Sequence, residues 1–215
     1  MSISTLFIDL DDTLYPPSSG VWTLIRQRID LYIHERLALP WAQVHDLRST
    51  LFEQYGTTMR GLQACYHIDE ADYLAFVHDV PVETLIQPDP LLRQVLEQYP
   101  QRKVIFTNAD VNHANRVIKA LGFIGLFDQI IDICAISPHC KPQPLAFQIA
   151  LSLTGECDPA RCLLADDTAA NIRAALEFGF QAVLIGSPPS EDGHYPCIPR
   201  LHDLPLVLPI SHSST

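Results

Sequence analysis

The sequence predicts an α/β protein in which a parallel sheet carries helices on both faces and is interrupted after its first strand by an all-helical insert. Three observations lead to this fold class. A buried apolar run near the N-terminus ends in a cluster of carboxylates. Residues 16–88 have helical periodicity and no convincing strand. From Pro88 onward, short apolar runs alternate with helical segments of about ten residues, the pattern of a parallel sheet.

The first strand is expected over residues 3–10, where few polar residues interrupt the apolar run. This strand delivers Asp9, Asp11 and Asp12 to its carboxyl end. Buried carboxylates are unfavourable unless a cation receives them. Because side chains alternate along a strand, we expect Asp9 and Asp11 on one side and Asp12 on the other, as a structural residue. This arrangement suits a divalent cation and a reacting phosphate better than a salt bridge.

The helical insert follows a turn cluster of prolines, serines and glycine at residues 16–20. Apolar side chains then recur at helical spacing, Gly56 closes one helix, and Asp69 is a candidate N-cap for another. The stretch 55–62 is expected to be a polar interruption. Helices are predicted over 21–39, 41–55 and 69–77. We therefore expect a helical domain over residues 16–88 inserted into a discontinuous core formed by 1–15 and 89–215.

The core resumes with helices that open at proline or close at glycine, between short apolar strands. Beyond Gly186 the chain becomes proline-rich, with Pro188 and Pro189 at its start, and is expected to follow the surface with one edge strand at 204–208. In chain order, helices are predicted at 90–99, 112–121, 145–153 and 169–178, and strands at 103–107, 130–134, 162–165 and 182–185.

Composition narrows the class of protein. The chain has 215 residues and a formal net charge of −11. This charge argues against a nucleic-acid polymer as a binding partner and leaves no basic face to bind anionic lipid. Its six cysteines lack the spacing of a zinc site or a disulfide framework, as expected for reduced thiols. No basic segment precedes the first apolar run, and no run reaches the length of a membrane span. We expect a cytoplasmic protein that does not bind membranes; the sequence predicts no oligomeric state.

Four polar groups follow predicted core strands or lie just beyond them. They are Asp9 with Asp11, Thr107 with Asn108, Lys141, and Asp166 with Asp167. Each has an ordinary explanation by itself, since aspartates often cap turns or helices and a lysine before proline is usually solvated. Ligands of open parallel sheets bind at the carboxyl edge, where distant residues converge. All four groups together, in this order, predict one site.

The chemistry of these groups fits phosphoryl transfer through an aspartyl phosphate. A phosphomonoester resists attack because its anionic oxygens repel nucleophiles and its alkoxide is a poor leaving group. Asp9 is expected to attack phosphorus. Asp11 is expected to protonate the leaving oxygen and then take a proton from the hydrolytic water.

The remaining groups would neutralise and orient the phosphate. Mg²⁺ prefers oxygen ligands, so Asp9, the backbone carbonyl of Asp11, and Asp167 are the expected metal ligands. Thr107 and the backbone N–H of Asn108 are expected to bind phosphoryl oxygens. Lys141 is expected to neutralise charge on the nucleophile and on the intermediate.

These motifs resemble those of the haloacid dehalogenase-like hydrolase superfamily. The resemblance covers about residues 5–186 and rests on Asp9-Leu10-Asp11-Asp12-Thr13, Thr107-Asn108, Lys141-Pro142 and Ala165-Asp166-Asp167-Thr168. It implies a Rossmann-like core, a magnesium-dependent aspartyl-phosphate mechanism and, with an insert at this point, a helical cap of the first class. It also implies that Asp167 is the metal ligand and Asp166 an auxiliary carboxylate, with Asn171 either orienting the pair or acting as an ordinary helix residue.

A closer resemblance is to the pyrimidine 5'-nucleotidase branch. It rests on the first motif extended to Pro16 and Gly20, on residues 55–62, on Phe76-Val77-His78, and on Pro88-Asp89-Pro90. Met59 stands where leucine is common and Thr168 where serine is common. Within the insert, Arg60 and Tyr55 are candidates to contact the substrate beyond its phosphate, because arginine pairs with anions and tyrosine can stack on a base. The alternative is an interhelical loop shaped by Gly56 and Gly61.

The sequence therefore predicts a Mg²⁺-dependent phosphatase for a small phosphorylated metabolite, with nucleoside 5'-monophosphates first in line. Three alternatives stay open: a phosphatase for a sugar phosphate or phosphoglycolate, a phosphomutase, and a non-enzymatic phosphoacceptor or scaffold domain. A haloacid dehalogenase is disfavoured because its chemistry does not need the acid at Asp11. The histidines show no paired metal spacing and are expected to be structural or solvated: His34, His67, His78 and His113.

Overall fold

One parallel sheet forms the core of the computed structural model, which describes residues 2–186 and 195–210. The strand order within these residues is β3-β2-β1-β4-β5-β6. The strands are Thr5–Ile8 (β1), Arg102–Phe106 (β2), Gln129–Ile131 (β3), Cys162–Asp166 (β4), Gln181–Ile185 (β5) and Cys197–Ile198 (β6). β1 is central and pairs with β2 and β4. The residues that follow these three strands therefore share one edge of the sheet.

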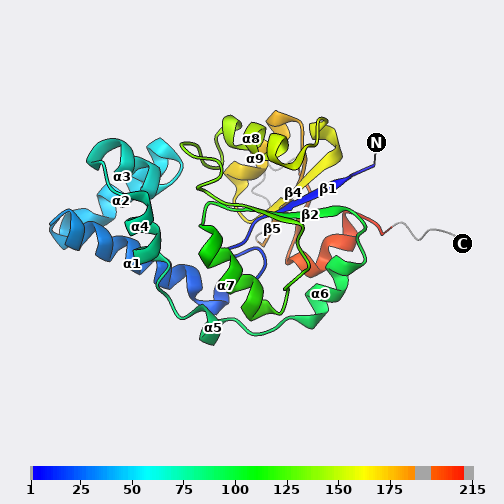
Figure 1. Ribbon diagram of the computed structural model, residues 1–215, viewed down its shortest axis with the longest axis horizontal. Helices are drawn as coiled ribbons and strands as arrows, with labels where there is room; N and C mark the ends of the chain where they lie inside the picture. The colour runs from blue at the N-terminus through cyan, green and yellow to red at the C-terminus, as the bar shows by residue number, and fades with distance from the viewer. Residues whose placement is uncertain (1, 187–194, 211–215) are drawn as a thin grey trace, which may run out of the picture.

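Helices cover both faces of the sheet (Figure 1). Alternate residues of β1 enter different clusters: Leu6 and Ile8 pack with α6 and α7, whereas Phe7 packs with α8 and α9. These helices span Pro90–Glu97 (α6), Val111–Leu121 (α7), Pro144–Thr154 (α8) and Ala169–Phe178 (α9). The predicted α/β class, with its parallel sheet and helices on both faces, is confirmed.

The insert between β1 and β2 is helical, as predicted, and α1 to α4 form a lobe on the side toward which β1 runs (Figure 1). Its helices span Val21–Arg36 (α1), Trp41–Tyr55 (α2), Thr58–Tyr66 (α3), Glu70–Val77 (α4) and Val82–Leu85 (α5). Short 3-10 turns lie at Pro17–Ser19 and Pro159–Arg161. The lobe formed by α1 to α4 is called the cap below.

The prediction of a polar interruption over residues 55–62 is wrong, because most of this stretch belongs to α3. The Thr57 side chain caps the helix by accepting a hydrogen bond from the Arg60 backbone N–H at 3.2 Å. Gly61 weakens the helical pattern of this stretch in the sequence, since glycine is a poor helix former. A Cβ at Gly61 would lie 2.6 Å from Cβ of Leu51 on α2, so glycine permits close packing of the two helices.

The edge strand predicted at 204–208 is also wrong. The chain instead forms a 3-10 helix at Leu201–Leu206, and the edge strand is the short β6. Pro205 lacks the N–H that a strand would use. Leu201 and Leu204, three residues apart, align on one side of the 3-10 helix and are both buried. Pro188 and Pro189 lie outside the described residues.

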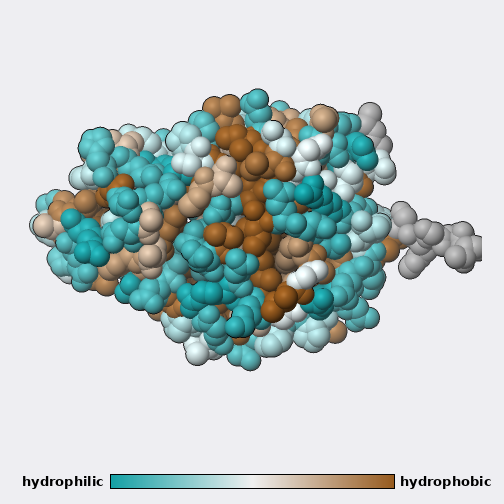
Figure 2. All heavy atoms as spheres, viewed as in Figure 1, coloured by the Kyte–Doolittle hydropathy of each residue, from teal (hydrophilic) through white to brown (hydrophobic). Residues whose placement is uncertain are grey.

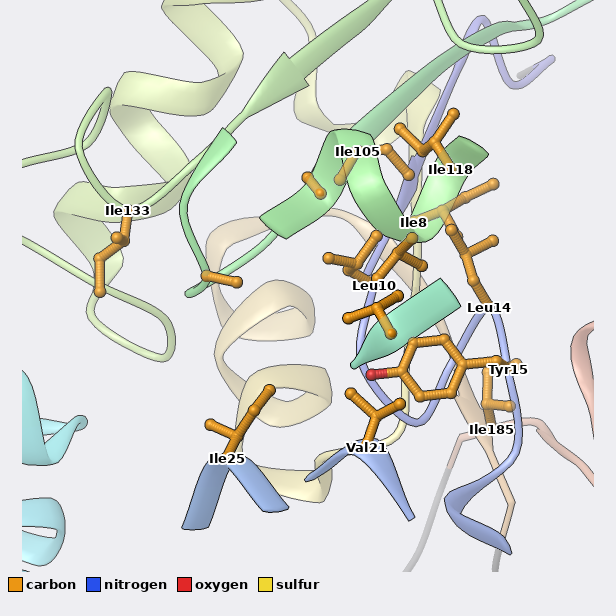
Figure 3. Packing of buried hydrophobic residues seen from close by; sticks show 14 of the residues in the cluster. Ile8, Leu10, Leu14, Tyr15, Val21, Ile25, Ile105, Ile118, Ile133 and Ile185 are labelled. Carbon is orange, nitrogen blue, oxygen red and sulfur yellow. The ribbon is translucent and has the colours of Figure 1, made fainter. Parts of the chain in front are cut away.

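The loop that follows β1 packs against both the cap and the core. Leu14 and Tyr15, which follow β1, belong to the same buried cluster as Val21 at the start of α1 and Ile185 at the end of β5 (Figure 3). On the face shown in Figure 2, the cap surface is mostly hydrophilic, whereas hydrophobic residues gather in a band over the core. None of the helices in the described part of the chain combines the length and apolar character that a bilayer span requires.

Candidate active site

A cavity of about 680 Å³ is lined by residues of both the core and the cap. On the core side it collects side chains that follow β1, β2 and β4, together with Lys141 from the loop after β3. The predicted site residues that line it are Asp9, Asp11, Thr107, Asn108, Lys141 and Asp167. Residues more than 130 positions apart in sequence thus meet, as illustrated by the Asp9 to Lys141 contact. The predicted convergence at the carboxyl edge of the sheet is present in the structure.

The three acids after β1 do not alternate as predicted. The strand ends at Ile8, although the Asp9 N–H still donates to the Ala165 carbonyl at 2.9 Å, and the chain then turns. Asp12 adopts a left-handed conformation, with φ of 58°. All three residues consequently line the cavity, so the prediction that Asp12 faces away is wrong. Burial and then repulsion from Asp11 raise the pKa of Asp12 to about 6.

Lys141 neutralises two carboxylates at the base of the site. Its Nζ lies 2.7 Å from Oδ1 of Asp9 and 2.6 Å from Oδ2 of Asp166, with the lysine almost wholly buried. Burial alone would lower the pKa of Lys141, but Asp166 and Asp9 outweigh burial and raise it. The Asn108 amide fixes the lysine backbone: its Oδ1 accepts from Lys141 N at 2.9 Å and its Nδ2 donates to Lys141 O at 3.0 Å.

Asp166 lies beneath the cavity and is fully buried. Its Oδ1 accepts from the Thr168 N–H at 2.8 Å, and both of its oxygens accept from Nδ2 of Asn171, at 2.9 and 3.0 Å. With Lys141 on Oδ2, every oxygen of this carboxylate has at least two donors. Asn171 therefore orients Asp166, one of the two roles left open by the sequence. Asp166 has the environment of an auxiliary carboxylate.

A cation could be held by the carboxylates of Asp9, Asp166 and Asp167, whose oxygens lie within 4.8 Å of one another. Burial raises the pKa of Asp9 well above its usual range, opposed by Lys141 and reinforced by Asp166 and Asp167. Burial and Asp166 raise the pKa of Asp167 to about 6. The carboxylates repel one another, and a divalent cation that prefers oxygen ligands, such as Mg²⁺, would offset this repulsion. Since Asp166 is occupied by donors, Asp9 and the exposed Asp167 would hold the cation.

Asp11 points its carboxylate toward a tyrosine and a histidine of the core. Its Oδ1 accepts a hydrogen bond from the Tyr15 hydroxyl and lies 2.8 Å from Nε2 of His113. Burial would raise the pKa of Asp11, but the charge and hydrogen bond of His113 and the hydrogen bond of Tyr15 lower it below its usual value. The Asp11 side chain is not in the cation group; its predicted metal contact was through the backbone carbonyl.

His113 is the site residue that sequence reasoning missed. It was expected to be structural or solvated, yet its buried ring contacts Asp11 across 102 positions of sequence. Metal-type spacing could not identify it, because the contact is with a carboxylate on another element. The available signal was its place in the first turn of the helix that follows β2 and Thr107, close to the edge where ligands bind.

The predicted cap residues Arg60 and Tyr55 do not line the cavity. The buried Arg60 guanidinium donates to Glu70 at 2.5 Å and to the carbonyl oxygen of Ile133 at 2.7 Å, so it joins α3 to the core loop after β3. The Tyr55 carbonyl accepts from Nε2 of Gln143 at 3.2 Å, a further link between cap and core. Cap residues that do line the cavity include Trp22, Arg26, His45, Arg48, Ser49 and Phe52.

Comparison with known proteins agrees with this geometry. Residues 3–179 match the family model described as haloacid dehalogenase-like hydrolase. The chain is 31% identical over 192 residues to Phosphate metabolism protein 8 of Saccharomyces cerevisiae, an alignment that covers 83% of this chain. It spans only 60% of the length of that relative.

Solved structures with this fold include both dehalogenases and phosphatases. A HAD phosphatase from Thermococcus onnurineus superposes with a TM-score of 0.64 at 18% identity, covering 98% of this chain and 99% of the other. An L-2-haloacid dehalogenase from Xanthobacter autotrophicus superposes with a TM-score of 0.61 at 17% identity, covering 97% of this chain and 100% of the other. YfnB from Bacillus subtilis, bound to magnesium, superposes with a TM-score of 0.63 at 17% identity, covering 98% of this chain and 100% of the other. At these identities the similarity demonstrates the fold alone.

Proposed function

Because the chain belongs to the haloacid dehalogenase-like hydrolase family, we propose that it is a Mg²⁺-dependent phosphatase that acts through an aspartyl phosphate on Asp9. The observation that carries this proposal is the arrangement of two acids at one cavity. Asp9 is paired with the buried Lys141, and Asp11 is held two residues further on by neutral or basic donors. The two carboxylates thus have different partners: a buried cation for the proposed nucleophile, and two hydrogen-bond donors for the proposed proton carrier.

In the first step a carboxylate oxygen of Asp9 forms a bond to phosphorus while the bond from phosphorus to the leaving oxygen breaks. Asp11 transfers a proton to that oxygen. In the second step Asp11 takes a proton from water, whose oxygen attacks phosphorus and releases Asp9 and inorganic phosphate. Lys141 opposes the effect of burial by favouring the ionised form of Asp9, and it offsets negative charge in both steps. Mg²⁺, held by Asp9 and Asp167, would supply further positive charge to the phosphoryl oxygens and orient them.

Three alternative functions fit the residues less well. A dehalogenase releases a halide, which needs no proton, so the Asp11 arrangement would have no purpose there. A scaffold without activity would have no need to keep the charged set intact, but Asp9, Asp11, Lys141 and Asp167 are all present. A phosphoacceptor signalling domain has these groups in a different chain order and has no helical cap after its first strand. The charged set therefore favours hydrolysis of a phosphomonoester over these alternatives.

As substrate we propose a nucleoside 5'-monophosphate, following the resemblance to the pyrimidine 5'-nucleotidase branch. The cavity of about 680 Å³ has room beyond the phosphate. Its cap wall offers aromatic rings, among them Trp22 and Phe52, and polar groups that include Ser49. Aromatic rings stack on nucleobases, and polar groups can read the base edge. These lining residues, rather than Arg60 and Tyr55, are the proposed contacts with the nucleoside.

A phosphate-release screen tests this function. Purified protein with Mg²⁺ is assayed against UMP, CMP, purine nucleoside monophosphates, sugar phosphates and phosphoglycolate. We expect the highest kcat/KM with UMP and CMP. Flat, low activity across the panel would indicate a broad phosphatase. No phosphate release from any substrate would contradict the proposed reaction.

Replacing Phe52 with alanine is expected to lower kcat/KM for UMP by about tenfold, because stacking on a base contributes about 1–3 kcal/mol. The effect should appear mainly in KM. Activity on glycerol 3-phosphate, which has no base, should be unchanged. The measurement is a pair of steady-state titrations with the two substrates.

Trp41→Ala is the matched control. Trp41 is 55% exposed and Phe52 is 53% exposed, but only Phe52 lines the cavity. Trp41→Ala should leave both substrates unaffected. An equal loss on UMP and glycerol 3-phosphate in Phe52→Ala would argue against a base-stacking contact.

A further inference from the structure

We propose that His113 is a positioning residue for Asp11: together with Tyr15 it holds one carboxylate oxygen so that the other is presented to the leaving group. This inference rests on the proposed function, because it assigns Asp11 the role of proton carrier. It adds a residue that none of the predicted motifs contains.

The contact geometry fixes which atom does what. Nε2 of His113 lies 2.8 Å from Oδ1 of Asp11, and the histidine side chain is fully buried. Oδ1 accepts when Asp11 is ionised and also when Asp11 carries its proton on Oδ2, so Nε2 is the donor. The Tyr15 hydroxyl donates to the same oxygen. Both donors thus engage Oδ1. Among the described residues none donates a hydrogen bond to Oδ2, which is the oxygen available to the cavity.

His113 is itself held by neighbouring residues. The His113 backbone N–H donates to Oδ1 of Asp110, the N-cap of α7, at 2.7 Å. Its ring stacks on His78, with centroids 4.5 Å apart and planes inclined by 17°. Nδ1 of His78 lies 3.0 Å from Oδ2 of Asp110. Asp110 therefore contacts both histidines: it accepts from the backbone N–H of His113, and it lies beside the ring of His78.

His78 connects this arrangement to the chain that leaves the cap. It is the C-cap residue of α4, and its carbonyl accepts from Nη1 of Arg116 at 3.0 Å. Arg116 also donates to the Val80 carbonyl at 2.6 Å. The segment between cap and core is thus attached to α7 beside the ring that holds Asp11. Nδ1 of His113 is buried with no partner among the described residues, so Asp11 is the polar contact that orients this ring.

Placement matters because a proton donor must reach the leaving oxygen within hydrogen-bond distance. A displacement of about 1 Å can lower a rate on the order of 100-fold. Without the His113 contact, Asp11 would keep one donor, Tyr15, and could rotate about its side-chain bonds. The consequence should be confined to reactions that need the proton.

The test compares leaving groups. The uridine alkoxide of UMP needs a proton when it leaves, whereas the dinitrophenolate of 2,4-dinitrophenyl phosphate does not. The quantity measured is kcat/KM, which reports steps up to the first irreversible one, formation of the aspartyl phosphate. His113→Leu is expected to lower kcat/KM for UMP on the order of 100-fold and to leave that for the dinitrophenyl ester within about threefold.

Two further variants separate positioning from folding. His113→Gln can place an amide N–H near the position of Nε2 and should restore most of the UMP activity. His113→Asn is too short to reach Asp11 and should behave like His113→Leu, which keeps the test usable if the leucine variant does not fold. His34→Leu is the control: His34 stacks on Trp41 in the cap, with centroids 4.3 Å apart, and its loss should not separate the two substrates.

Equal losses on both substrates in the folded His113 variants, or full UMP activity in His113→Asn, would overturn the positioning role. Asp11→Asn distinguishes this failure from a failure of the proposed function. If Asp11→Asn separates the substrates and the His113 variants do not, Asp11 is the proton carrier but His113 does not position it. If Asp11→Asn also fails to separate them, the proposed role of Asp11 is wrong, and the positioning role falls with it.

Discussion

Asp9→Asn is expected to reduce Mg²⁺-dependent phosphate release from UMP by ~10⁴-fold or more, because an amide cannot act as the nucleophile in place of a carboxylate. The substitution also removes the negative charge that pairs with Lys141, whose Nζ lies 2.7 Å from Asp9 Oδ1. It removes one of the oxygens proposed to hold Mg²⁺ as well. The measurement is phosphate release under saturating UMP and Mg²⁺.

Asp128→Asn is the appropriate control for this change. Asp128 accepts from the Lys103 N–H at 2.8 Å, close to the start of β2 and far along the strand from the site. Its replacement tests for a general effect of losing an acid, and activity should be retained. Wild-type activity in Asp9→Asn would end the assignment of Asp9 as nucleophile.

The second large effect is expected for Lys141→Met, on both stability and activity. Methionine would leave Asp9 and Asp166 buried without their shared cation. Breaking a buried pair by removing one partner typically destabilises a protein by about 3–5 kcal/mol. We expect a loss of this size in urea unfolding with a chelator present, and partial recovery when Mg²⁺ is added. Phosphate release should fall by at least ~100-fold, since the charge on the phosphoryl group is no longer offset.

Lys103→Met provides a matched comparison. Lys103 is also buried, but its Nζ donates to the carbonyls of Tyr99 and Gln101 at 2.6 and 3.1 Å rather than to carboxylates. Its replacement leaves no unpaired charge, so the loss of stability should be smaller and insensitive to Mg²⁺. Equal unfolding free energies for wild type and Lys141→Met would contradict the proposed role of the buried cation.

The core elements could be predicted because their signals are local. Apolar runs such as 103–107 and 162–165 begin three residues after a proline and are followed by polar residues. The rule that ligands bind at the carboxyl edge of a parallel sheet predicted that Asp9, Lys141 and Asp167 lie together. The family motifs added the metal-ligand assignment. These signals do not depend on how side chains of distant elements pack.

The misses arose where tertiary contacts decide the outcome. Gly61 weakens the local helix signal of α3, but the approach of α2 requires it. Asp12 faces the cavity because β1 ends at Ile8, a boundary that alternation rules cannot locate. The contact of His113 with Asp11 joins two elements far apart in sequence. The direction of Arg60 was likewise set by acceptors elsewhere, including the carbonyl of Ile133.

Chemical trapping of the acyl phosphate tests the central claim, nucleophilic attack by Asp9, most directly. Protein mixed with UMP and Mg²⁺ is quenched in acid during turnover and treated with borohydride, which reduces an aspartyl phosphate to homoserine. Peptide mass spectrometry then locates the change. We predict homoserine at position 9 in the wild type and at no position without substrate or in Asp9→Asn. Homoserine at another aspartate, or none in samples that have released phosphate, would contradict the claim.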